Sequence, residues 1–147
     1  MSGFLQSVDF PRHGTQVLVV KFLLDTCAFL WLSDRTDCLS AKVIELVSDA
    51  ENELFVHQAT TLEIQLKYDK GNLSLVIPPH KFIPEAISRH KLLYNAFTDA
   101  DIFFLEKLPA YHRDPFDRIL ICHAIINGFT IISPDPLIHQ YPVNTIW

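Results

Sequence analysis

The chain is short of cysteine and lacks the usual spacings of a zinc site. Its 147 residues include three cysteines, Cys27, Cys38 and Cys122, and no two of them form a CxxC pair. An odd number of thiols without that spacing argues against a disulfide scaffold and favours a reducing, cytoplasmic environment. The seven histidines form no HExxH motif or other metal-binding spacing.

Positive charge is also scarce. Lys and Arg total 12 against 17 Asp and Glu, which gives a formal net charge of −5. This balance argues against a broad basic surface for nucleic acid. It does not exclude RNA, because acids that hold a divalent cation lower the formal charge and still attract phosphate.

The sequence has no apolar run of membrane-spanning length. The aliphatic stretch Val17–Leu24 is interrupted by Lys21 and is far shorter than a transmembrane helix. The first twenty residues lack a basic start and contain Asp9, Pro11 and Arg12, unlike a signal peptide. We therefore expect a cytoplasmic protein with no membrane partner.

Predicted strands alternate with predicted helices. Residues 17–24 read as a strand buried on both faces, and Asp114-Pro115 begins the clearest helix, which ends before Gly128. Further strands are expected at 53–56, 92–97, 129–132 and 144–147. Further helices are expected at 27–32, 41–50, 60–70 (opened by a capping box of Thr60 and Glu63), 82–90, 98–109 and after Asp135. The alternation predicts one α/β domain over residues 17–147 with a largely parallel sheet, preceded by an irregular extension over residues 1–16.

Four acids fall where a predicted strand passes into the next helix. Asp25 follows the first strand, Glu63 and Asp117 lie in first helical turns, and Asp135 follows the strand at 129–132. In an open α/β sheet these junctions gather at one edge, where ligands bind. Taken singly, each acid is more simply explained as a helix cap or a partner of the helix dipole.

Convergence of the four acids would change that interpretation. Carboxylates within a few ångströms of one another repel strongly, so protons or divalent cations must neutralise them. An all-oxygen ligand set suits Mg²⁺ or Mn²⁺ rather than zinc. Within His112–Arg118, Asp114 precedes a proline and is predicted to be the helix cap, whereas Asp117 lies one turn into the same helix.

Four sequence blocks, in this order, resemble PIN-domain ribonucleases, and in particular the VapC-type toxins of bacterial toxin–antitoxin pairs. The blocks are Leu24–Trp31, Leu62–Lys67 with Gly71–Leu73, His112–Arg118 with Ile121–Ala124, and Ile131–Pro136. The resemblance extends from about residue 20 to the end of the chain.

The resemblance implies a three-layer α/β/α fold with a central, mostly parallel sheet, and a Mg²⁺- or Mn²⁺-dependent endoribonuclease. The family's acids correspond to Asp25, Glu63, Asp117 and Asp135, which are the expected catalytic and metal-binding residues, and its small hydroxyl residue corresponds to Thr26. The resemblance also implies an RNA substrate, a cognate antitoxin and a homodimer.

Several further residues are secondary candidates. Arg118 is a candidate phosphate contact, as are Arg113, Lys67 and Lys70, although a solvated face or salt bridges explain them equally well. His112 is expected to hydrogen-bond its loop, with a role in orienting a ligand as the alternative. Asp114 remains a secondary candidate ligand.

Two other readings of the sequence are possible. The haloacid-dehalogenase pattern is disfavoured, because it needs a second aspartate at position 27, which is a cysteine. Cys27, together with Leu62 and His57, departs from the family's common residues without removing an acid. A non-catalytic PIN scaffold that binds RNA or protein without cleaving is the main alternative, and the four intact acids disfavour it.

Overall fold

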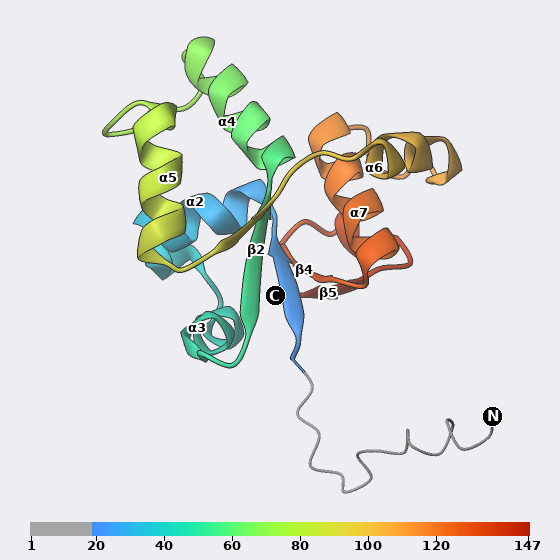
Figure 1. Cartoon of the computed structure of the whole chain (residues 1–147), viewed down its shortest axis with the longest axis horizontal. Coiled ribbons are helices and arrows are strands. Elements are labelled where there is room, and N and C mark those ends of the chain that lie inside the picture. The colour runs from blue at the N-terminus through green and yellow to red at the C-terminus, as the bar shows by residue number, and fades with distance from the viewer. Residues whose placement is uncertain (1–18) are drawn as a thin grey trace, which may run out of the picture.

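A five-stranded parallel sheet forms the centre of the molecule (Figure 1). The computed structural model describes residues 19–147, so the predicted extension over residues 1–16 and the first two residues of the predicted strand 17–24 lie outside the described residues. The strands are β1 (Lys21–Leu24), β2 (Glu53–His57), β3 (Leu93–Asn95), β4 (Thr130–Ile132) and β5 (Asn144–Ile146). Their spatial order is β3-β2-β1-β4-β5, and every neighbouring pair is parallel. The α/β prediction with a parallel sheet is confirmed.

Helices cover both faces of this sheet and complete the three layers. They are α2 (Thr26–Asp34), α3 (Ala41–Ser48), α4 (Gln58–Asp69), α5 (Pro79–Arg89), α6 (Asp99–Phe103) and α7 (Pro115–Asn127), with 3₁₀ turns η1 (Thr36–Cys38), η2 (Phe104–Lys107) and η3 (Ile138–Gln140). Figure 1 shows α2, α3 and α5 on one side of the sheet and α6 and α7 on the other. No helix within residues 19–147 is long and apolar enough to cross a membrane.

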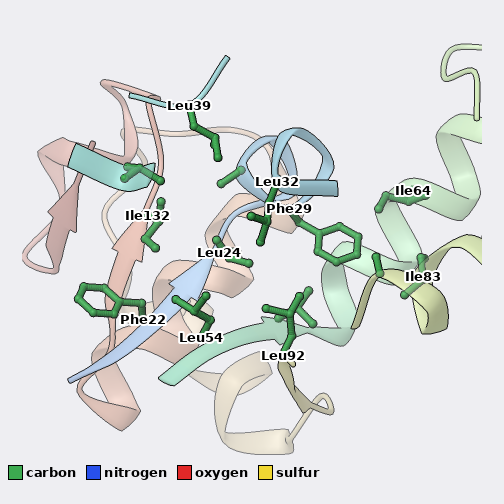
Figure 2. Packing of buried hydrophobic residues seen from close by; sticks show 14 residues of the cluster. Phe22, Leu24, Phe29, Leu32, Leu39, Leu54, Ile64, Ile83, Leu92 and Ile132 are labelled. Atoms are coloured by element: carbon green, nitrogen blue, oxygen red, sulfur yellow. The ribbon is translucent and has the colours of Figure 1, made fainter. Parts of the chain in front are cut away.

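The central strand β1 contributes to two separate apolar cores. Leu24 packs with Phe29 and its neighbours under α2, α3 and α5, as Figure 2 shows. Leu23 points to the opposite face and packs with Leu120 of α7. Because successive side chains of a strand alternate between faces, an aliphatic β1 can supply both cores. The prediction of a strand buried on both faces is confirmed for Phe22–Leu24, whereas Val19 and Val20 precede the strand and are exposed.

Helix α4 begins two residues earlier than predicted, and the predicted capping box is wrong. His57 caps the helix, because its Nδ1 accepts the Ala59 N–H at 2.9 Å. The Thr60 hydroxyl instead lies 3.1 Å from the Thr26 hydroxyl, and Glu63 accepts a hydrogen bond from Thr26. Both residues turn into the protein interior and are therefore unavailable to cap the helix.

The remaining boundaries differ in smaller ways. Helix α5 starts at Pro79 rather than at residue 82, since proline is favoured in a first helical turn. The helix predicted over 98–109 divides into α6 and η2, although Thr98 and Asp101 form the capping box at its start. The helix predicted after Asp135 is only the turn η3. Helix α7 agrees with its prediction, and Gly128 ends it with a positive φ of 74°.

A buried polar junction joins the strands to the α6–α7 layer. Asp101 accepts hydrogen bonds from His57 Nε2 at 3.1 Å and from His123 Nδ1 at 2.9 Å. Asn95 Nδ2 lies 2.8 Å from His123 Nε2 on the other side of that ring. The three ionisable side chains are almost completely buried. They stand 44 and 22 residues apart in the chain, so no local sequence pattern could have predicted the junction.

The junction contains a charged carboxylate held between two imidazole rings. Burial alone would raise the pKa of Asp101, but the hydrogen bonds with His123 and His57 outweigh it and hold that pKa below its ordinary value. Burial lowers the pKa of His57 in spite of its hydrogen bond to Asp101, so this imidazole is neutral. Each hydrogen bond to a buried charge contributes about 1.5–3 kcal/mol.

Replacing Asp101 by asparagine should therefore destabilise the fold. We expect Asp101→Asn to lower the free energy of unfolding by on the order of 2–4 kcal/mol in urea titrations at pH 7.5. Because the folded-state pKa of Asp101 is lowered, this contribution is present above its ordinary value of 3.8 and disappears as the pH falls through the folded-state value.

The exposed Asp34 of α2 provides the matched control for this substitution. Asp34→Asn should change the free energy of unfolding by no more than about 0.5 kcal/mol. Equal stabilities of Asp101→Asn and Asp34→Asn would contradict a stabilising buried charge.

Candidate functional site

All four predicted acids line one cleft at the carboxyl edge of the sheet. The cleft has a volume of about 290 Å³ and is lined by five carboxyl groups, those of Asp25, Glu63, Asp114, Asp117 and Asp135. Asp25 directly follows β1, and Asp135 lies just beyond β4. The parallel register brings these two strand ends together, because Leu24 of β1 pairs with Ile132 of β4. Glu63 comes from α4, Asp117 from the first turn of α7, and Asp114 from the residue that precedes α7.

Asp25 serves the fold and the cleft at the same time. Its Oδ1 accepts the Ala28 N–H at 2.8 Å and caps α2. Burial raises its pKa to about 6, against hydrogen bonds with Ser133 and Ala28 that lower it, and the nearby charges of Asp135 and Glu63 raise it further. A proton or a cation near Asp25 would therefore be bound more readily than at an ordinary carboxylate.

Each carboxylate oxygen of Glu63 has a hydrogen-bond partner. The Thr26 hydroxyl donates to its Oε1 at 2.7 Å, and Lys67 Nζ lies 2.6 Å from its Oε2. This hydrogen bond raises the pKa of Lys67, whose side chain is half-exposed and remains an ammonium group. Thr26, a secondary candidate from the sequence, thus orients Glu63, and Lys67 is the predicted basic candidate that does lie in the cleft.

The two aspartates at the start of α7 have different surroundings. Asp114 Oδ1 accepts the N–H groups of Phe116 at 2.8 Å and Asp117 at 3.1 Å, which confirms the predicted helix cap. Burial raises the pKa of Asp117 to about 7, and the charges of Asp114, Asp25 and Glu63 add to the increase. Asp114 also lines the cleft, so the cap contributes to the negative potential around Asp117.

His112 lies between the carboxyl groups of Asp117 and Asp135. Its Nε2 is 2.8 Å from Asp135 Oδ2 in a hydrogen bond, and Asp117 Oδ2 lies 3.0 Å from the same nitrogen. Its Nδ1 accepts the Asp114 N–H at 3.2 Å, so the expected loop hydrogen bond is also present. The sequence suggested a role in orienting a ligand only as the alternative for this residue.

Arg118, a secondary candidate for a phosphate contact, is directed at the loop before α7 and not at the cleft. Its guanidinium donates to backbone carbonyls of the preceding loop, at 2.9 Å to Pro109 and 3.3 Å to His112 and Leu105. Pro109 and His112 lie in the irregular segment before α7, and Leu105 lies in the 3₁₀ turn η2; the guanidinium, with its five N–H donors, can reach all three carbonyls. The side chain is absent from the described residues that line the cleft.

The thiol of Cys27, which lines the cleft, is a poor nucleophile at neutral pH. Desolvation, followed by the charges of Asp25 and Asp117, raises the pKa of Cys27 to about 11. The group is therefore a protonated thiol at neutral pH, whereas the nucleophilic form is the thiolate.

Two other features of the described residues could be mistaken for the site. The nitrogen and oxygen atoms of His57, Asp101 and His123 lie close enough to hold a metal ion. However, the Ala59 N–H occupies the lone pair of His57 Nδ1, so Nε2 carries the proton and has no lone pair for a metal. A larger groove of about 490 Å³ between α4 and α5 is lined by Pro79, Ile83 and other residues without any carboxyl group.

The cleft has the chemistry of a site for a hard divalent cation. Among the described residues that line it, five carboxyl groups surround one basic residue, Lys67. Burial raises the pKa of Asp25 and of Asp117, and neighbouring carboxylates raise both further, so a cation that compensates their charges would be bound favourably. Carboxylate oxygens from several elements are the ligands that Mg²⁺ and Mn²⁺ prefer.

Known structures share this fold. The chain is similar to a protein in the VapBC2 structure from Rickettsia felis, bound to a promoter DNA fragment, with a TM-score of 0.66 and 15% identity over 87% of this chain and 99% of that one. It is also similar to a chain of VapBC-1 from nontypeable Haemophilus influenzae, with a TM-score of 0.59 and 14% identity over 86% and 97% of the two chains. At these identities the similarity establishes the fold.

A third similar structure is a domain of a functionally unknown protein from Methanocaldococcus jannaschii, with a TM-score of 0.53 and 15% identity over 88% of this chain and 91% of that one. No curated protein matches the sequence significantly. The family model of the PIN domain matches residues 22–143, which include all five acids of the cleft. The chain therefore belongs to the PIN domain family.

Proposed function

We propose that this PIN-domain protein is a Mg²⁺- or Mn²⁺-dependent endoribonuclease. The observation that carries the proposal is the convergence of five carboxyl groups in one cleft of about 290 Å³. Helix caps alone would not require these acids to meet. Burial, to which the charges of neighbouring acids add, raises the pKa of Asp25 and of Asp117, so the charged forms of both groups are unfavourable without a cation.

Asp25, Glu63, Asp117 and Asp135 are the proposed ligands. A divalent cation bound there would supply the positive charge that activates water and stabilises the phosphate in the transition state. Thr26 fixes the orientation of Glu63. In this proposal the ammonium of Lys67, which is half-exposed at the cleft, contacts a phosphate oxygen of the substrate.

We further propose that the protein is the toxin of a bacterial toxin–antitoxin pair. The support is the similarity of its fold to chains of two VapBC structures, together with the sequence blocks that resemble VapC-type toxins. In this role RNA is the substrate, a cognate antitoxin binds the protein, and the protein forms a homodimer.

A non-catalytic PIN scaffold is the second candidate. The observation in its favour is the contact of 2.6 Å between Lys67 and Glu63, which partly neutralises one of the proposed ligands. Calorimetric titration with Mn²⁺ alongside an RNA cleavage assay separates the two functions, because a scaffold can bind Mn²⁺ but does not cleave RNA.

Cleavage should depend on the metal and on the proposed ligands. With a mixture of end-labelled transfer and ribosomal RNA, we expect Mn²⁺ to support cleavage and EDTA to abolish it. Asp25→Asn and Asp117→Asn should each lower the rate by roughly 100-fold or more, since even indirect perturbation of a metal site costs about 10- to 100-fold.

Asp114→Ala is the matched control for this assay. It should retain cleavage and lose about 1 kcal/mol of stability, because its side chain caps α7. EDTA-resistant cleavage would overturn the mechanism. An equal loss of cleavage in Asp114→Asn at unchanged stability would show that Asp114 and Asp117 have been assigned the wrong roles.

Removing one of the crowded charges should stabilise the metal-free protein. The folded-state pKa of Asp117 is about 7, above its ordinary 3.8, so its charge opposes folding at pH 8, and this cost falls as the pH drops through 7. In urea titrations with EDTA at pH 8, Asp117→Asn should raise the free energy of unfolding by on the order of 1–3 kcal/mol.

Saturating Mn²⁺ should remove this advantage, because the cation neutralises the same charge and stabilises the wild type. The exposed Asp34→Asn variant should remain close to the wild type in both buffers. A loss of stability in metal-free Asp117→Asn would contradict the picture of uncompensated charge.

A further inference from the structure

His112 is the one histidine, among residues 19–147, that contacts two of the proposed metal ligands. Asp117 belongs to the first turn of α7, and Asp135 follows β4 on a separate segment. One nitrogen atom, His112 Nε2, lies within 3.0 Å of a carboxylate oxygen from each of them. The His112 residue is only 8% exposed, so water does not readily replace these contacts.

The hydrogen bonds around the ring decide which nitrogen carries its proton. Backbone N–H groups can only donate, and the Asp114 N–H is directed at Nδ1 at 3.2 Å. Nδ1 is therefore the acceptor in the neutral ring, and Nε2 is the donor that faces Asp135 and Asp117. A ring in this tautomer offers the carboxylates a hydrogen and offers a metal ion no lone pair.

The backbone N–H and carbonyl groups of His112 are also hydrogen-bonded. The His112 N–H donates to Tyr141 Oη at 2.7 Å, and the same hydroxyl donates to the Pro109 carbonyl at 2.8 Å. Arg118 Nη1 lies 3.3 Å from the His112 carbonyl. Tyr141 is 4% exposed, so these bonds anchor the residue to the protein core.

We propose that His112 is a positioning residue, which sets the separation of Asp117 and Asp135 for a cation and is not itself a ligand. Without a donor between them, two neighbouring carboxylates repel and turn apart. The Nε2–H satisfies one lone pair of Asp135 Oδ2, and each carboxylate keeps further lone pairs for a cation. Groups that orient metal ligands commonly alter metal affinity by about 10- to 100-fold when removed. The inference rests on the proposed metal-dependent function.

A pair of substitutions of similar length isolates the donor. His112→Gln retains an N–H group at the end of the side chain, whereas His112→Met retains the bulk and has no donor. Neither side chain carries an acceptor at the δ position that Nδ1 occupies, although the glutamine amide has an oxygen at its end and the methionine sulfur is a weak acceptor. In calorimetric titrations with Mn²⁺, we expect His112→Met to bind about 10-fold or more weakly than the wild type. His112→Gln should remain within about threefold of the wild type, since it keeps the donor.

Controls separate positioning from folding and from ligation. The exposed His80→Ala, away from the cleft, should bind Mn²⁺ as the wild type does. Thermal unfolding of the metal-free variants checks that His112→Gln and His112→Met are folded to the same extent. Pulsed electron paramagnetic resonance of the Mn²⁺-loaded wild type should show no coupling to an imidazole nitrogen.

Each outcome bears on a different claim. Equal Mn²⁺ affinities of folded His112→Gln and His112→Met would overturn the positioning role, even if the wild type cleaves RNA. An imidazole coupling that disappears in His112→Gln would also overturn it and make His112 a ligand. The expected Mn²⁺ affinities without any RNA cleavage would support the positioning role while overturning the proposed ribonuclease function.

Discussion

Repulsion among carboxyl groups at the carboxyl edge of the sheet is the constraint on which the rest of the site depends. Parallel strands place all their C-terminal ends at one edge, and the first residues of the following helices lie there too. Asp25 and Asp117 consequently share a small, partly desolvated cleft in which both ionise less readily than usual. The protein supplies partial compensation through Lys67, the Thr26 hydroxyl and His112. The remaining negative charge makes the cleft suitable for a divalent cation.

Residues of the segment His112–Arg118 have different roles in and around the acidic cleft. Asp114 caps α7 and presents its own N–H to His112. Asp117, one turn into the helix, faces the cleft. Arg118 turns back to the loop carbonyls and secures the main chain that carries His112. One short segment therefore contains a helix cap, a candidate ligand, a group that contacts two acids and an anchor for that group.

The buried junction around Asp101 is a second polar centre with a structural role. His57 ends β2 and caps α4, the helix that carries Glu63, while His123 belongs to α7, the helix that carries Asp117. Both rings donate to the same carboxylate, so the two helices are tied to a common point inside the protein. Buried hydrogen-bonded groups of this kind have few alternative arrangements, because each lost partner leaves an unsatisfied polar atom. The junction thus fixes the relative positions of two helices that supply acids to the cleft.

Local sequence patterns were sufficient to predict the fold class and the part of the sheet at which the acids lie. The apolar β1, the Asp114-Pro115 start and Gly128 end of α7, and the alternation of strands with helices determined the α/β class, because these signals depend on backbone conformation and side-chain periodicity along the chain. The placement of the acids at strand and helix junctions predicted that they could meet.

Only the tertiary structure decided how the acids meet and what surrounds them. It replaced the Thr60–Glu63 capping box with inward hydrogen bonds, directed Arg118 away from the cleft and assembled His57, Asp101 and His123 into one network. It also placed His112 between Asp117 and Asp135. These contacts join residues on different elements, so they depend on strand order, register and side-chain direction, which the packing of the whole fold determines and a local sequence pattern does not specify.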